Sequence, residues 1–467
     1  RPRGWSGRAD KDIPRFEGVD RLNLSAIRVG SPLEDVDREE RVRPACDGGA
    51  GPHRAEARVH RLVAETEAVD DIRQDRGVKA GRHEVETVGV GRRQCGHDRD
   101  SLRVRGREYS RAARRPEASL DDAPWAFPRC ARREARETMA DEMYRSVDAA
   151  GLERLVADLF VHAGLSAEDA AFMGECLVDA DLRGVHSHGT RWAPRYVASL
   201  AAGHLNPHAK AKVVVDRGAT AIVDGDRGVG HIAVKFAMDI AIAKAKEFGN
   251  GTVGVRNNSH CGAVAYYAQQ AADAGCIGFA ATTGGTMIAP WGGLDRRVGL
   301  NPISWAAPTG LGFSYNLDMA PSIVAGSKIE MARDRGESIP AEWGYDADGH
   351  PTTNPSDIMP GGGTLAGVGG YKGVGLGVGA DILCSILPAG RYHEGQEPTV
   401  GGGMIVQAID IEHFQPLAEF TGRMDRMVSY YKSGRKRPGV DDVYLPGELE
   451  AGRAHARVTA GIPLDQP

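Results

Sequence analysis

Strand-like and helix-like segments alternate along the chain from residue 212 onward, and this alternation limits the fold more than any other feature of the sequence. Two apolar runs, 212–216 and 220–225, are joined by Arg217-Gly218, and the helical pattern that follows at 233–248 ends at Gly249. Interleaving of this kind predicts an α/β core. The further segments that we expect are helices 262–274, 321–335, 374–387 and 417–431, and strands 252–257, 276–283, 302–308, 313–319 and 403–410.

Three helices are expected ahead of this core. Apolar residues at helical spacing predict the first helix at 152–160. Ser166 and Asp169 form a capping box for the second helix, which continues to Gly184. The third helix, 194–202, begins with proline, which is permitted in the first turn. The core therefore has helical segments before it as well as after it.

The first 138 residues differ in composition from the rest of the chain. They are rich in arginine, and Leu, Ile, Val and Phe together fall below the roughly 20% that a chain needs to bury a core. The first methionine is Met139, directly before the first expected helix. We predict that residues 1–138 are disordered or a wrongly extended reading frame; a small domain without a readable pattern is the alternative.

Charge and cysteine usage exclude several classes of protein. The net charge of -5 and the pI near 6.3 do not indicate a protein that binds nucleic acid. The seven cysteines contain no C-x-x-C pair, which argues against a zinc ribbon or a disulfide scaffold and fits a reducing cytosol. We see no signal peptide, and the apolar stretch 374–387 is short for a membrane span and carries Asp381. We therefore expect a cytoplasmic protein with no membrane partner.

Two turns place histidine where a side chain can face a ligand. Residues 181–189 read DLRGVHSHG, just past a helix end, and residues 257–262 read NNSHCG, just before the helix expected near Gly262. The positive end of that helix disfavours a protonated His260, and a neutral histidine is what a general base needs. A hydrogen-bonded loop histidine is the plain alternative. A zinc site made of His186, His188 and His260 is a second alternative.

Glycine-rich segments suggest binding of a phosphate or carboxylate. Residues 228–233 match G-x-G-x-x-A between a strand and a helix, although the next strand ends without the acidic residue of a Rossmann fingerprint. Residues 369–375, GGYKGVG, put a lysine in a glycine-rich loop at a helix start. Long Gly/Pro-rich loops at 284–301 and 338–372 favour a functional role over plain connection.

Six motifs in order make the chain from Met139 onward resemble the malate/L-lactate dehydrogenase family of NAD(P)-dependent oxidoreductases. The segments that carry the resemblance are 181–189, 257–267, 289–308, 317–322, 369–376 and 443–450. The resemblance implies a family-specific nicotinamide-binding fold in place of a Rossmann domain, and a homodimer. It divides residues 139–467 into a helical part 139–208, a cofactor-binding α/β core of about 209–390 and a C-terminal part 391–467.

The resemblance also implies a reaction and a set of site residues. The expected reaction transfers a hydride between NAD or NADP and a small 2-hydroxy or 2-oxo acid, such as malate, lactate or ureidoglycolate, with His188 and His260 as candidates for the acid/base. Removing the proton requires a neutral histidine, and orienting the carboxylate requires a cation, which we assign to Arg191 or Arg195. The cofactor is expected to contact Val264, Ala265, Tyr266, Asp318, Met319, Ala320, Pro321, Ser322, Tyr371, Lys372, Gly373, Gly447 and Glu448.

Two positions depart from the family pattern. Trp192 stands where many members have arginine, and Thr282-Thr283-Gly284 replaces the usual Thr-Asn-Ser. Both are expected to touch the substrate, so the departures put its identity in doubt. A metal-dependent hydrolase and a non-catalytic relative that binds a cofactor or metabolite remain as alternatives, and no metal is assigned.

Overall fold

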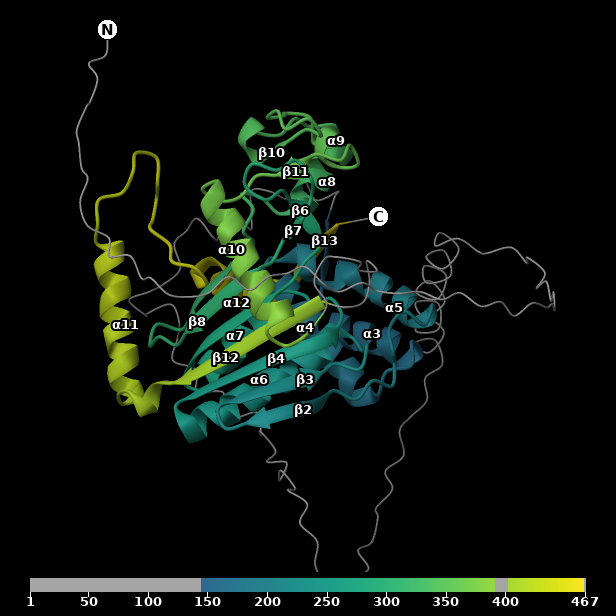
Figure 1. Ribbon diagram of the computed structural model, residues 1–467. Coiled ribbons are helices and arrows are strands. Elements are labelled where there is room, and N and C mark those ends of the chain that lie inside the picture. The colour runs from purple at the N-terminus through teal and green to yellow at the C-terminus, as the bar shows by residue number, and fades with distance from the viewer. Residues whose placement is uncertain (1–143, 391–401, 466–467) are drawn as a thin grey trace, which may run out of the picture. The chain divides into compact units, whose positions relative to one another are not determined.

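The computed structural model describes residues 144–390 and 402–465, and the prediction for residues 1–138 lies outside this part. Its centre is a seven-stranded sheet in the order β2-β3-β4-β12-β5-β8-β9 (Figure 1). Only β3 and β4 pair in parallel; the other neighbours are antiparallel. The strands are β2 (Lys212–Arg217), β3 (Thr220–Asp224), β4 (Asn250–Asn258), β5 (Cys276–Thr282), β8 (Ile303–Ala307), β9 (Tyr315–Met319) and β12 (Gly402–Asp410). The predicted α/β class is confirmed, and a doubly wound parallel sheet is absent from the described residues.

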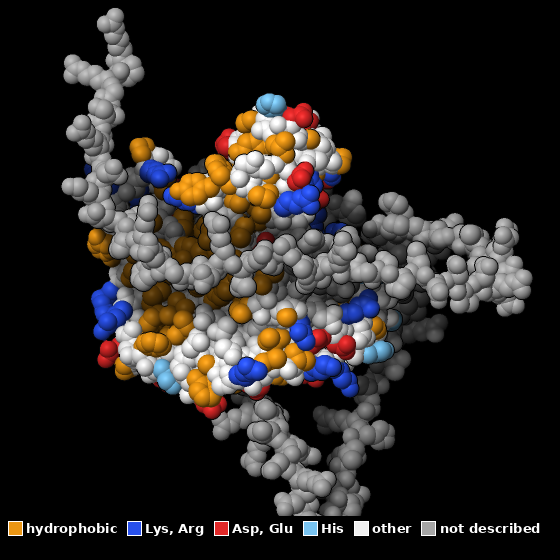
Figure 2. Space-filling model, in the orientation of Figure 1, with side chains coloured by type: hydrophobic (Ala, Val, Ile, Leu, Met, Phe, Trp, Pro, Cys, Tyr) orange, Lys and Arg blue, Asp and Glu red, His pale blue; other side chains and the backbone are white. Residues whose placement is uncertain are grey.

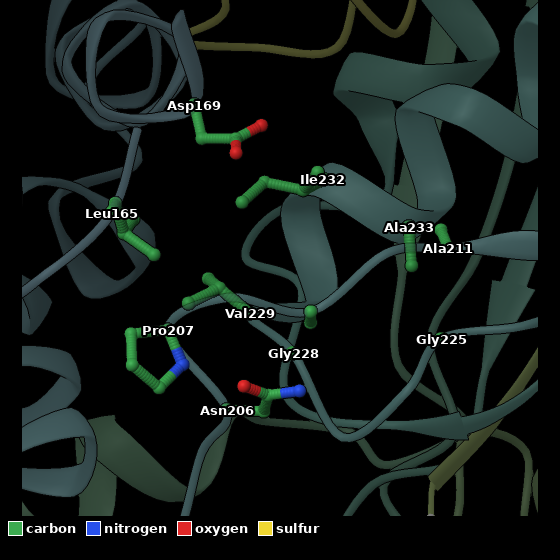
Figure 3. Close-up of a pocket in the computed structure, with 11 residues that line it drawn as sticks. Leu165, Asp169, Asn206, Pro207, Ala211, Gly225, Gly228, Val229, Ile232 and Ala233 are labelled. Atoms are coloured by element: carbon green, nitrogen blue, oxygen red, sulfur yellow. The ribbon is translucent and has the colours of Figure 1, made fainter. Parts of the chain in front are cut away.

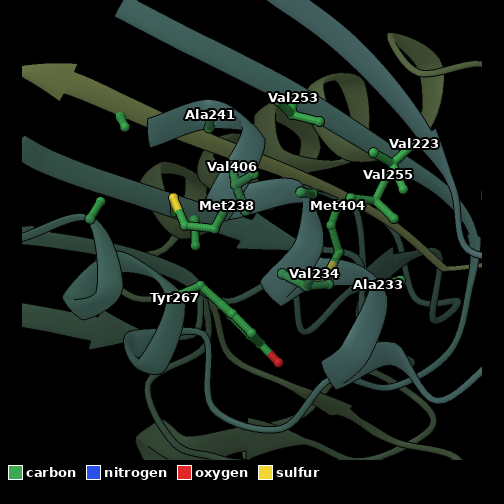
Figure 4. Packing of buried hydrophobic residues seen from close by; sticks show 14 of the residues in the cluster. Val223, Ala233, Val234, Met238, Ala241, Val253, Val255, Tyr267, Met404 and Val406 are labelled. Carbon is green, nitrogen blue, oxygen red and sulfur yellow. The ribbon is translucent and has the colours of Figure 1, made fainter. Parts of the chain in front are cut away.

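Two helices cover one face of this sheet. Helix α6 (Gly230–Phe248) packs on β4 and β12, and α7 (Ala265–Asp273) packs on β5 and β8. Their alanine-rich inner sides meet the apolar residues of the strands, and Met238, Tyr267 and Met404 fill the space between them (Figure 4). Small residues on the helices allow close approach to the sheet, so this layer holds the end of β4 and the start of α7 in fixed positions.

A third helix covers the opposite face. Helix α10 (Tyr371–Asp381) continues into a π-helical turn (Ile382–Ile386) that packs on β12 and β4 (Figure 1). Ala380 and Cys384 are buried there against Ile405. Within the described part of the chain, no helix has the length and apolarity that crossing a membrane would need.

The N-terminal helices form a second core beside the start of α6. It contains Phe160, Met173, Tyr196 and Val229, together with Ile462 from the far end of the chain. The expected helices are present: α3 (Ala149–His162), α4 (Ala167–Leu182), capped by Ser166, and α5 (Ala193–Ala201). The first and last described strands, β1 (Tyr144–Val147) and β13 (Ile462–Asp465), pair with each other, and α12 (Glu448–Ala460) lies on α4.

The long loops predicted at 284–301 and 338–372 contain a second, smaller sheet. Its order is β10-β11-β6-β7, and Ile288, Ile358 and Leu365 are buried within it (Figure 1). Its strands are β6 (Thr286–Ile288), β7 (Val298–Gly299), β10 (Gly344–Tyr345) and β11 (Thr364–Leu365), and the helices α8 (Gly326–Asp334) and α9 (Pro355–Ile358) share its core. The strands are only two or three residues long, too short to leave an alternating pattern, so the sequence predicted loops here and missed these strands.

The G-x-G-x-x-A segment serves packing at the start of α6. A Cβ on Gly230 would lie 2.2 Å from the backbone oxygen of Ser259, so glycine there lets the helix end approach β4 and the turn after it. The cavity beside Gly228 and Val229 holds only about 10 Å³ (Figure 3), which is no more than one water. A dinucleotide does not fit at this turn.

Candidate active site

One large cavity collects most of the residues that the sequence singles out. Its volume is about 1360 Å³, and α4, α5, α7, β9 and α12 contribute to its walls. His188 and His260, 72 residues apart in the sequence, both line it, and their rings stack with centroids 5.8 Å apart. The two histidine turns therefore meet at one site, as the sequence predicts.

The His260 side chain contacts Trp192 and Tyr196 and also lines the cavity. The Trp192 ring stacks on it at 4.5 Å between centroids and 16° between planes. The Tyr196 hydroxyl lies 2.5 Å from its Nδ1. The Trp192 indole is itself fixed, because its Nε1 donates to the backbone oxygen of Ser187 at 2.6 Å. The residue that departs from the family pattern thus forms one wall of the site.

Desolvation keeps His260 neutral. Burial, together with smaller contributions from the nearby His188 and Arg195, lowers the pKa of His260 to about 3. The expected cause was a different one, the helix end: α7 begins only at Ala265, because Gly262 adopts a left-handed φ of 73°. The neutral state of His260 stays a prediction, which burial supports in place of the helix end.

His188 lies at the end of a short 3-10 turn, His186–His188. Its Nδ1 is 2.9 Å from the Ser187 hydroxyl, and burial lowers its pKa. Since a hydroxyl can donate or accept a hydrogen bond, this contact leaves both neutral tautomers of His188 open.

Two buried residues complete the histidine cluster, and the sequence analysis missed both. Tyr196 is 4% exposed, and burial raises the pKa of its hydroxyl well above the ordinary value. His231 is fully buried, and its ring meets Tyr196 edge-on at 5.3 Å. Neither of its ring nitrogens has a hydrogen-bond partner among the described residues. A tyrosine on the inner face of α5 is a usable signal, because a buried hydroxyl needs a partner. His231, inside the misleading glycine motif, gives no comparable signal.

His186 belongs to a structural network and not to the site. Its Nδ1 lies 2.8 Å from the buried carboxylate of Asp181, and its Nε2 lies 3.1 Å from Arg457. Asp181 also accepts hydrogen bonds from the backbone and hydroxyl of Thr190, and it leaves no room for a Cβ on Gly189. This network explains the D-x-x-x-x-H-x-H-G spacing. Among the described residues, no group of three or more His, Cys, Asp or Glu side chains is arranged to hold a metal.

The two arginine candidates lie in different places. Arg195 lines the cavity, with its guanidinium carbon 5.0 Å from the Trp192 ring centroid. Arg191 is exposed and does not line the cavity. Arg183, another cation in the wall, is engaged by both carboxylate oxygens of Asp179 at 2.8 and 3.0 Å. Arg195 is therefore the better placed of the two candidates to meet a carboxylate beside His260.

Some of the residues predicted to contact the cofactor line the cavity, and others do not. Those that line it are Val264, Ala265, Tyr266, Asp318, Met319, Ala320 and Gly447. The others do not: Pro321, Ser322, Tyr371, Lys372, Gly373 and Glu448. Tyr371 is 60% exposed, at the start of α10. Glu448 is buried in an ion pair with Lys432 at 2.5 Å and caps the backbone of Leu445. Its carboxylate stabilises the C-terminal turn and does not face the cavity.

Asp318 connects two of the lining segments. Its carboxylate faces the cavity and accepts a hydrogen bond from the Ala265 backbone at the start of α7, at 3.1 Å. The protein around it raises the pKa of this carboxyl to about 6. The group can therefore hold or release a proton near neutral pH at the wall of the cavity.

Comparison with known proteins agrees with this arrangement over most of the chain. The family described as malate/L-lactate dehydrogenase matches residues 147–467. Malate dehydrogenase of Pyrococcus abyssi is 38% identical over 334 residues, covering 69% of this chain and 92% of that protein. Ureidoglycolate dehydrogenase (NAD(+)) of Escherichia coli K12 is 31% identical over 320 residues, covering 67% and 90%.

Solved structures show the same fold. Malate dehydrogenase from Pyrococcus horikoshii superposes with a TM-score of 0.64 at 34% identity, covering 69% of this chain and 92% of that one. Sulfolactate dehydrogenase from Methanocaldococcus jannaschii gives 0.64 at 32% identity, covering 69% and 94%. The chain thus shares its overall fold with these two enzymes, as the motif resemblance implies. With its family-specific fold and both histidine turns in place, the chain belongs to the malate/L-lactate dehydrogenase family.

Proposed function

We propose that this protein is an NAD-dependent dehydrogenase of a small 2-hydroxy acid. The observation that carries the proposal is the pairing of two neutral histidines, His188 and His260, in a cavity with Arg195 beside them. The names of the relatives above describe dehydrogenases of 2-hydroxy acids, and one of these names specifies NAD(+) as the cofactor. They give no support to the hydrolase alternative, and His186 is engaged by Asp181, away from the proposed site.

The cavity has room for a dinucleotide together with a small acid. Ligand pockets are usually roughly 300–1,000 Å³, and this cavity of about 1360 Å³ exceeds that range. Val264–Tyr266, Asp318–Ala320 and Gly447 would hold the cofactor. When bound, the nicotinamide supplies or accepts the hydride.

The side chains of the chain divide the remaining work. Arg195 would bind the carboxylate of the acid, since a guanidinium can grip two oxygens and fix the orientation. During oxidation, His260 or His188 would accept the proton of the C2 hydroxyl, for which a neutral imidazole is suited. During reduction, the same histidine would first take up a proton from solvent and then pass it to the C2 oxygen. Trp192 would shield this side of the site from water, because its ring covers His260.

Spectrophotometry of the reduced nicotinamide tests the proposal directly. We expect the purified protein to oxidise NADH in the presence of at least one member of a panel of 2-oxo acids that includes oxaloacetate, pyruvate and an oxalurate-type acid. NADPH serves as the second cofactor. Binding of NADH without turnover of any acid would favour the non-catalytic alternative.

Replacement of the two histidines tests their roles. We expect His260→Gln and His188→Gln each to lower kcat by about 10²–10⁴-fold, with the Kd of NADH little changed. His186→Gln, in the structural turn, is the matched control and should retain more activity than either. Near-normal turnover in both site variants would contradict the assignment.

We also propose a cytoplasmic homodimer. Large apolar side chains are exposed on α10 and the turn after it, among them Leu376, Ile382 and Ile386. Figure 2 shows exposed apolar side chains on the face that carries this helix. A second copy that covers them would explain their exposure. Light scattering should give twice the mass of one chain. Ile386→Glu places a charge on the proposed interface and should lower the measured mass toward that of one chain.

A further inference from the structure

The Nδ1 atom of His260 receives two hydrogen-bond donors. The Tyr196 hydroxyl is 2.5 Å away, and the Gly262 backbone N–H points to the same nitrogen at 3.4 Å. A backbone N–H can only donate, so this long contact favours a lone pair on Nδ1 but is too weak to fix the tautomer by itself. The Tyr196 hydroxyl is un-ionised, because burial raises its pKa, and it too can donate to that lone pair.

A neutral imidazole carries one proton. If Nδ1 accepts, the proton is on Nε2, which has no hydrogen-bond partner among the described residues. The exposed His260 side chain lines the cavity, where a ligand can meet this nitrogen. We propose that Tyr196 is a positioning residue that holds His260 in the Nε2–H tautomer, so that His260 donates a hydrogen bond to the C2 oxygen of a bound 2-oxo acid. This inference rests on the proposed function for the identity of the acid, but the tautomer itself does not depend on it.

The surroundings of Tyr196 suit a positioning role. Its ring packs against Phe160 at 6.4 Å, Trp192 at 5.8 Å and His231 at 5.3 Å between centroids. Three rings from different elements therefore hold the tyrosine ring in place, and this fixes the position of its hydroxyl oxygen. Among the described residues, neither ring nitrogen of His231 makes a hydrogen bond, so the Tyr196 hydroxyl is shared with His260 and not with His231.

A fixed tautomer assigns different work to the two histidines. An Nε2–H group polarises a carbonyl oxygen as soon as the 2-oxo acid binds, and such a donor contributes most when charge develops on that oxygen. His188, whose Nδ1 contacts a hydroxyl that can donate or accept, has no such constraint. Tyr196 thus prepares the site for reduction of the 2-oxo acid.

Nitrogen NMR of the ligand-free protein tests the tautomer without any activity. Long-range proton–nitrogen correlations, assigned with His260→Gln, should show Nε2 protonated and Nδ1 unprotonated in the wild type. In Tyr196→Phe, we expect a mixture of tautomers. Tyr267→Phe is the matched control, since it removes another buried tyrosine hydroxyl, which donates to the backbone of Cys261 next to His260. This control should keep the wild-type signals.

Kinetics complete the test. Tyr196→Phe should lower kcat for reduction on the order of tenfold, with the Kd of NADH unchanged, and Tyr267→Phe should not. A protonated Nδ1 in the wild type, or an unchanged tautomer in Tyr196→Phe, would overturn the inference. If no 2-oxo acid is reduced while the NMR result holds, the proposed function fails and the tautomer assignment stands.

Discussion

At the residue scale, the position of Arg195 makes a prediction that separates it from its neighbour Arg191. Both were candidates from sequence, but only Arg195 lines the cavity. A hydrogen bond to a charged group contributes about 1.5–3 kcal/mol, so Arg195→Ala should raise KM for the acid by about 10- to 150-fold. Arg191→Ala should change KM less than about twofold. Steady-state kinetics with a saturating cofactor measures both, and equal effects would refute the assignment.

The buried, unpartnered His231 predicts a dependence of stability on pH. Burial lowers the pKa of His231 well below its ordinary value, and the neighbouring His260 and His188 lower it further. Below an unfolded pKa of about 6.5 the unfolded chain binds the proton and the folded chain does not, so the free energy of unfolding falls as pH falls. Denaturant unfolding at about pH 7.5 and about pH 5 should show this loss, and His231→Leu should reduce it.

The control for His231 is an exposed histidine. His455 lies on the surface of α12, so His455→Leu should leave the pH dependence as in the wild type. If His231→Leu loses as much stability on acidification as the wild type, the buried imidazole is not its source.

The residues of the site were predictable to different degrees. His188 and His260 follow from motifs, because each motif is local in sequence. The contact of Tyr196 with His260 spans 64 residues and depends on how α5 packs against the turn after β4. The sequence can indicate that a buried Tyr196 hydroxyl needs a partner, but no local pattern shows that the partner is His260.

At the element scale, most helices and strands were predicted, and the errors have local causes. Helix α7 starts three residues after the predicted Gly262, because that glycine has a φ of 73° and its missing Cβ makes room for His231. Helix α6 starts at Gly230, three residues before the predicted 233. The prediction missed this start because no polar capping residue marks it in the sequence. Backbone conformation at glycine is not readable from apolar periodicity.

The close approach at the start of α6 predicts the effect of a single methyl group. In Gly230→Ala, the new Cβ would meet the backbone oxygens of Ser259 and His260 at 2.2 and 2.5 Å, and backbone cannot move aside as a side chain can. We expect a loss of about 1–3 kcal/mol in the free energy of unfolding, and a lower kcat because His260 shifts. Thermal unfolding and initial rates measure the two effects.

Gly375 supplies the control for this substitution. It lies within α10, and nothing is within 4 Å of where a Cβ would stand. Gly375→Ala should be neutral or stabilise the protein by up to about 1 kcal/mol, because alanine favours the helix. A similar loss in both variants would show that the contact with the 259–260 backbone is not the cause.

At the scale of the whole molecule, the sheet order is what the sequence leaves open. Strand β12 inserts between β4 and β5, which precede it by more than a hundred residues, and it pairs antiparallel with both. Strand positions were predictable from apolar runs, but pairing between distant strands depends on the packing of all layers together. The same holds for the second sheet, whose strands come from two separate loops.

The pairing of the first and last described strands predicts that the C-terminus stabilises the N-terminal helices. Ile462 on β13 is fully buried in the core formed by α3, α4 and α5, and its partner in the strand pair is Val147. Ile462→Ala should therefore lower the free energy of unfolding by about 2–5 kcal/mol through lost burial and the cavity it leaves. Val458→Ala, four residues earlier and 65% exposed on α12, should change it by less than about 0.5 kcal/mol. Equal stability of the two variants in denaturant unfolding would mean that β13 is peripheral. A selective loss in Ile462→Ala would mean that the ends of the described chain form one cooperative unit with α3, α4 and α5, which carry Tyr196 and flank the turn of His188.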